Sequence, residues 1–167
     1  MSNRTKKLVF LGLIASVALI LSYIEAMLPP IYAAIPGIKI GLPNIVIVFL
    51  LYRYGVKEAA TVSLIRLLIS MLLFGNPTMF IYSAAGAFLS LLFMAVVKKI
   101  GIFSTVGVSV VGGIFHNLGQ IICAIFLLET AEIGYYMFVL AISGTLAGIF
   151  IGILGGMLLE KLNVKKH

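Results

Sequence analysis

A few polar side chains lie inside otherwise apolar segments, where ionisable groups are costly and usually mark a functional site. Arg66 has leucine and isoleucine on both sides, and His116, Asn117 and Gln120 lie near the middle of another apolar run. An arginine offers a fixed positive charge with several N–H donors, and histidine and amide side chains add further hydrogen bonds. These residues could together bind the carboxylate or phosphate of a small molecule.

Four further residues are candidates for the outer part of the same pocket. They are Lys39, Asn44, Asn76 and Tyr82. Apolar and aromatic walls would hold the organic part of the ligand. Structural roles remain open at this stage: Arg66 could pair with Glu25 or cap backbone carbonyls, and His116 could simply hydrogen-bond between helices.

Most catalytic chemistry is excluded by what the chain lacks. It contains no aspartate, a single cysteine (Cys123), and neither a phosphate-binding G-x-x-x-x-G-K-[ST] loop nor an H-E-x-x-H motif. An aspartate pair, an internal disulfide and ATP hydrolysis by this chain itself are therefore excluded. All five glutamates lie at the ends of apolar segments, which argues against an autonomous proton-driven carrier. We expect no enzymatic activity, no cofactor and no metal.

The composition predicts an integral membrane protein. Of 167 residues, 62% are hydrophobic and only 10% are charged, whereas about 25% are charged in ordinary soluble domains. A soluble fold of this length cannot hide so much apolar surface, and a disordered chain would be far more polar. We expect one all-α domain over residues 1–167.

Six apolar segments, separated by charges, prolines and glycines, predict a bundle of six transmembrane helices. The segments cover residues 8–28, 42–54, 58–74, 78–97, 104–128 and 135–159. The second is the weakest, because about 13 helical residues reach only about 20 Å across a core of about 30 Å. The stretch before it, 35–43, is broken by Pro and Gly, and is either an interfacial loop or a loop that folds over an external cavity.

The basic residues predict the orientation of the bundle. Ten of the twelve Lys and Arg residues fall on one side of the predicted helices, while Lys39 falls on the other and Arg66 lies inside a helix. Because basic loops stay in the cytoplasm, both termini should be cytoplasmic in a bacterial-type cell membrane. The positive charge therefore indicates topology and attraction to anionic lipid, not nucleic-acid binding.

Small residues predict close helix contacts. Gly144, Gly148, Gly152 and Gly156 recur at every fourth position, which favours packing of the last helix against another helix. Gly12 and Ser16 have the same spacing in the first helix. A flat face of this kind suits either internal packing or docking to another membrane protein.

Four stretches carry a family resemblance over essentially the whole chain. They are IPGIKIGLPNI at 35–45, LFGNP at 73–77, YSAAGAFLSL at 82–91 and HNLGQ at 116–120. They resemble the Gx transporter family, also known as heptaprenyl diphosphate synthase component I. That family is similar to the substrate-binding S components of energy-coupling factor (ECF) transporters.

The resemblance implies a substrate-binding subunit with six helices and cytoplasmic termini. Such subunits capture a vitamin-like solute from outside and work with a transmembrane coupling subunit and two cytosolic ATPases. Their first helix docks through a small-x-x-x-small face, which Gly12 and Ser16 match. The synthase name implies an alternative, a non-catalytic membrane component of heptaprenyl diphosphate synthesis, because prenyl diphosphate synthases use Asp-rich motifs. A structural membrane protein without a ligand is a third reading.

Overall fold

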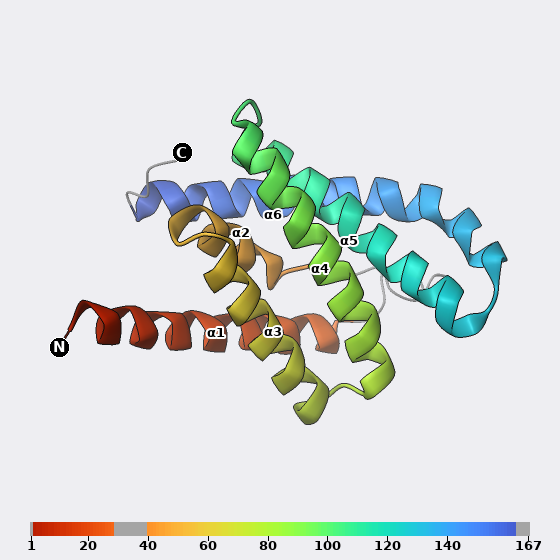
Figure 1. Cartoon of the computed structure of the whole chain (residues 1–167), viewed down its shortest axis with the longest axis horizontal. Helices are drawn as coiled ribbons and strands as arrows, with labels where there is room; N and C mark the ends of the chain where they lie inside the picture. The colour runs from red at the N-terminus through yellow and green to blue at the C-terminus, as the bar shows by residue number, and fades with distance from the viewer. Residues whose placement is uncertain (1, 29–39, 163–167) are drawn as a thin grey trace.

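The computed structural model describes residues 2–28 and 40–162, and in them six α-helices follow one another. The helices are α1 (Asn3–Met27), α2 (Asn44–Arg53), α3 (Val56–Leu73), α4 (Pro77–Ile100), α5 (Thr105–Leu128) and α6 (Met137–Lys161). A 3₁₀-helix, η1 (Ala131–Tyr136), precedes α6. Figure 1 shows α1 and α6 on opposite sides of α2. The predicted all-helical fold and its six helical segments are confirmed.

The ends of α4 illustrate how the sequence sets a helix boundary. At its start the Asn76 side chain accepts a hydrogen bond of 2.8 Å from the Met79 N–H, and Pro77 occupies the first helical position. Both features stabilise a helix N-terminus. At its end Gly101 adopts φ +81°, a left-handed conformation that glycine reaches without strain. The helix therefore extends three residues past the predicted end at 97.

Four helices of the described chain are long and apolar enough to cross a membrane: α1, α4, α5, and α6 together with η1. Helix α2 has 10 residues and spans only about 15 Å. Helix α3 has 18 residues but carries Lys57, Glu58 and Arg66. The molecule thus has the helices of an integral membrane protein, and six full crossings remain a prediction.

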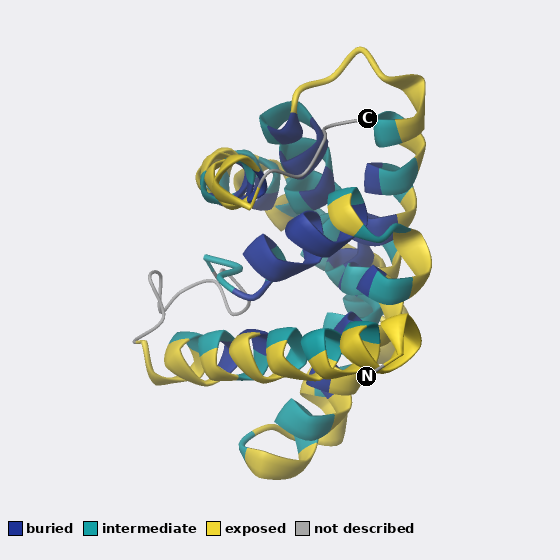
Figure 2. Cartoon of the chain, turned by 90° about the vertical axis from the view of Figure 1, so that its left-hand side faces the viewer, coloured by how far each residue is buried: buried dark blue, intermediate teal, exposed yellow. Residues whose placement is uncertain are grey.

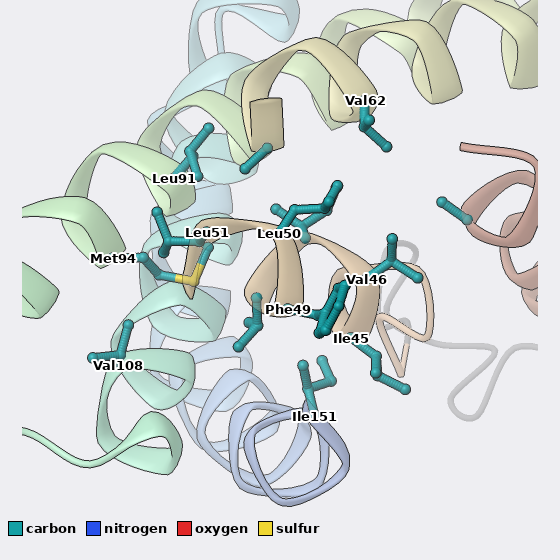
Figure 3. Close-up of a cluster of buried hydrophobic side chains, with 14 of the residues drawn as sticks. Ile45, Val46, Phe49, Leu50, Leu51, Val62, Leu91, Met94, Val108 and Ile151 are labelled. Carbon is teal, nitrogen blue, oxygen red and sulfur yellow. The ribbon is translucent and has the colours of Figure 1, made fainter. Parts of the chain in front are cut away.

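Helix α2 forms the centre of the molecule. Each residue from 45 to 51 is at most 8% exposed, and α2 is dark blue in Figure 2. Phe49 and Leu50 pack among side chains of the surrounding helices, including Leu91 and Ile151 (Figure 3). A helix that is apolar on every side must be surrounded by protein or by lipid, and protein surrounds residues 45–51 of α2. The short second segment is therefore the core of the bundle, which explains why it need not be long.

The glycines of α6 allow close contact with α5. A Cβ on Gly148 would lie 2.5 Å from the Val110 Cα, and one on Gly152 would lie 2.6 Å from the Val106 Cα. Gly144 lies equally close to the α5 backbone at Gly113. Gly156 differs from the sequence expectation, because a Cβ there would meet nothing within 4 Å. Each four-residue step turns about 40° beyond a full circle, so three steps rotate Gly156 away from α5.

Basic residues from several helices gather at one end of the bundle. Lys7 at the start of α1 forms an ion pair with Glu58 at the start of α3. Lys98 near the end of α4 donates a 3.0 Å hydrogen bond to the Leu51 carbonyl of α2. Arg53 lies 5.3 Å from the centre of the Phe10 ring of α1. These contacts join the helix ends that the sequence assigns to the same side of the membrane.

Candidate functional site

A pocket of about 380 Å³ lies toward the other end of the bundle. It is lined by the last turns of α1 and α3, the first turns of α2 and α4, and the middle parts of α5 and α6. These are the ends opposite to the basic cluster. All six helices contribute, so the pocket exists only in the assembled bundle.

The pocket brings together six of the eight residues predicted to bind substrate. They are Asn44, Arg66, Asn76, His116, Asn117 and Gln120. Tyr82 is half-buried but does not line the pocket. It lies next to the lining residue Ser83, and about 100° of helix rotation per residue separates the two side chains. Lys39 lies outside the described residues, as does most of the 35–43 stretch, so the choice between an interfacial loop and a covering loop stays open.

Arg66 is the most deeply placed charge of the pocket, with only 7% of its surface exposed. Its Nη1 donates a 3.1 Å hydrogen bond to the Ser22 hydroxyl of α1. The guanidinium Nε has no hydrogen-bond partner among the described residues. An arginine in this state is incompletely satisfied, and buried donors without partners are costly.

Glu25 lies in the same pocket, close enough to attract Arg66, but within the described part of the chain the two form no ion pair. The Glu25 carboxylate instead accepts a hydrogen bond from the Gly41 N–H. Gly41 has φ +78°, and this conformation favours glycine. Neither the Arg66–Glu25 pair nor capping of backbone carbonyls by Arg66 occurs in the described residues.

The amides of the pocket also have structural roles. The Asn117 Nδ2 donates a 2.6 Å hydrogen bond to the Leu140 carbonyl, and this bond ties α5 to α6. Asn76 caps α4. His116 packs against α4 at Gly86, where an added Cβ would lie 3.0 Å from the histidine Nε2. An interhelical hydrogen bond, which the sequence suggested for His116, is thus present at its neighbour Asn117.

Sequence reasoning missed Ser70, and it considered Glu25 only as a partner for Arg66. Ser70 lies one turn after Arg66 on α3 and lines the pocket with Phe74 one turn further. The signal was available, because residues at i, i+4 and i+8 share a helix face. A serine in a helix is a weak signal, because its hydroxyl often hydrogen-bonds within its own helix.

A family model described as heptaprenyl diphosphate synthase component I matches residues 14–158. The chain belongs to this family. No curated protein and no solved structure matches it. The matched range includes every described pocket residue, from Ser22 to Ile151.

Within this component I chain, the pocket combines a few polar side chains with apolar walls. Among the described residues no group of three or more acidic, His or Cys side chains could hold a metal ion. The polar atoms of Arg66, Gln120 and Ser70 share the pocket with apolar walls from Leu67, Phe80 and other residues. Such a site can take the acidic end of a small molecule and cover its organic part.

Proposed function

We propose that this chain is the substrate-binding membrane subunit of an ECF-type transporter. It captures a small anionic or amphipathic, vitamin-like solute from outside, and partner subunits drive its uptake with ATP. The observation that carries the proposal is the pocket of about 380 Å³ around the buried, incompletely bonded Arg66. The remaining support comes from the energetics of that arginine and from the exposed face of α1.

The energetics of Arg66 favour an anionic ligand. Burying a charge costs several kcal/mol unless a partner compensates it. Ser22 supplies one neutral hydrogen bond, and no carboxylate forms an ion pair with Arg66 within the described part of the chain. An acidic ligand would supply the missing charge and the missing acceptors. The pocket volume also lies within the range of about 300–1,000 Å³ that small-molecule sites occupy.

The exposed face of α1 supports a partner in the membrane. Gly12 and Ser16 are both exposed, and a Cβ on Gly12 would meet nothing within 4 Å. Much of α1 is coloured yellow, as exposed, in Figure 2. A smooth small-residue face lets a second helix approach closely. The chain lacks an ATP-binding motif, so a coupling subunit and ATPases would supply the energy.

The family description supports an alternative, in which the chain is a non-catalytic membrane component associated with heptaprenyl diphosphate synthesis. In that case the partner would be a soluble, Asp-rich synthase. The chain itself has no aspartate to bind magnesium diphosphate.

Purification from the native membrane separates the two functions. The tagged chain is extracted in mild detergent, and mass spectrometry identifies the proteins and small molecules that accompany it. The transporter function predicts cytosolic ATPases, a membrane coupling subunit and an acidic small molecule. Recovery of a soluble prenyl synthase without ATPases would contradict it.

Two variants locate the sites, and a third serves as a control. Arg66→Gln should lose the small molecule and keep the partner proteins, while Arg53→Gln, at the basic end of the bundle, should keep both. Gly12→Leu should lose the partners and keep the small molecule, because a bulky side chain spoils the flat face of α1. Retention of the small molecule by Arg66→Gln would show that the pocket is assigned wrongly.

A further inference from the structure

Two buried donors without partners lie one turn apart on α3. The Arg66 Nε and the Ser70 Oγ are both buried, and neither has a hydrogen-bond partner in the part of the chain that the structure describes. Both residues line the pocket, and residues at i and i+4 lie on one helix face. Because buried polar groups are almost always hydrogen-bonded, this pair indicates a place for a ligand oxyanion.

A negative charge lines the same pocket from α1. Glu25 and Arg66 are the charged side chains among its described lining residues. The Gly41 N–H occupies one oxygen of the Glu25 carboxylate, which leaves further acceptor positions, since a carboxylate offers about four lone-pair sites. The pocket therefore presents donors on α3 and an acceptor of full negative charge on α1.

We propose that the ligand is a small zwitterion, with an acidic group bound by Arg66 and Ser70 and an ammonium group bound by Glu25. This inference rests on the proposed function and narrows its substrate class. A simple anion would place its charge near Glu25 and be repelled, and a simple cation would be repelled by Arg66. A molecule carrying both charges satisfies both residues and leaves the buried site neutral.

The size and walls of the pocket fit a compact molecule. A volume of about 380 Å³ lies near the lower end of the range of about 300–1,000 Å³ that small-molecule sites occupy. Leu67, Met71 and Ile151 contribute apolar surface to the lining. The acidic and ammonium groups are therefore joined by a short apolar framework.

Matched pairs of simple probes test the zwitterion. Butanoate, pentanoate and hexanoate are compared with their ω-amino counterparts, and calorimetry measures binding to the full chain in detergent. At least one amino carboxylate should bind tenfold or more tightly than its matched carboxylate. The affinity ratio is the affinity of the amino carboxylate divided by that of its matched carboxylate. In Glu25→Gln, which keeps an acceptor for the Gly41 N–H, this affinity ratio should fall to about one. Ser70→Ala should weaken the preferred amino carboxylate severalfold.

Glu58→Gln is the matched control, because Glu58 pairs with Lys7 at the other end of the bundle. The affinity ratio measured with Glu58→Gln should equal that of the unaltered chain. If no amino carboxylate binds more tightly than its matched carboxylate, the inference is overturned. Arg66-dependent binding of plain carboxylates would then still agree with the proposed transport function, which the co-purification experiment decides separately.

Discussion

Polar residues in the middle of this bundle are of two kinds, and hydrogen bonding distinguishes them. Asn117 donates to the Leu140 carbonyl and thereby holds α5 to α6. Arg66 is buried but keeps an Nε without a partner among the described residues. A polar group with a hydrogen-bond partner in another helix has a structural role in packing. An unsatisfied one lowers the stability of the ligand-free protein, because its lost contacts with water are not replaced.

This contrast predicts opposite effects of two apolar substitutions in one pocket. Arg66→Met should leave the thermal midpoint of the ligand-free chain unchanged or raise it, because apolar replacement of a buried charge is often neutral or stabilising. Asn117→Leu should lower it, since an interhelical hydrogen bond in a membrane protein contributes about 0.6–1.7 kcal/mol. Thermal unfolding in detergent measures both. A marked loss of stability in Arg66→Met, of about 3–5 kcal/mol, would give that arginine a structural role.

At the scale of the helix, apolar runs and their interruptions predicted where the helices lie, but not what each helix faces. Helix α2 is an example, because the sequence of an apolar run does not show whether lipid or protein surrounds the helix. Only the packing of α3 and α6 around residues 45–51 shows that α2 is the core. The α6 glycines show the same limit. Gly156 meets nothing, whereas its neighbour Gly155 faces α2: a Cβ on Gly155 would lie 3.2 Å from a Val48 side-chain carbon.

The α6 contacts predict different outcomes for two glycine-to-alanine substitutions on the same helix. At Gly148 an added methyl group would lie 2.5 Å from the α5 backbone, so the two helices must separate. We expect a loss of about 1–3 kcal/mol of stability, as in other overpacked sites. Gly156→Ala meets no atom within 4 Å and should be neutral or stabilising by up to about 1 kcal/mol through helix propensity. Equal midpoints for the two variants in thermal unfolding would contradict the α5–α6 contact.

At the scale of the whole molecule, the site was only partly predictable because six helices build it. Arg66 and the HNLGQ stretch were recognisable, since polar side chains stand out in apolar runs. Ser70 shares a helix face with Arg66 and was within reach of sequence reasoning, whereas the place of Glu25 in the pocket depends on which helix faces Arg66. That placement follows from long-range packing and not from local sequence. The same packing places the basic residues at one end of the bundle and the pocket toward the other. The orientation of these two ends in the membrane can therefore be tested directly.

Single cysteines at the two ends test the orientation. In a Cys123→Ala background, Ile102→Cys lies just after Lys98 and Lys99 at the basic end, and Glu132→Cys lies between α5 and α6, in η1. Ile102 is 80% exposed and Glu132 is also exposed, so both should react readily. Because basic segments stay in the cytoplasm, a membrane-impermeant maleimide should label Glu132→Cys in intact cells and Ile102→Cys only after permeabilisation. The reverse pattern would turn the pocket toward the cytoplasm and remove uptake from outside as its function, and labelling of both in intact cells would show that α5 does not cross the membrane.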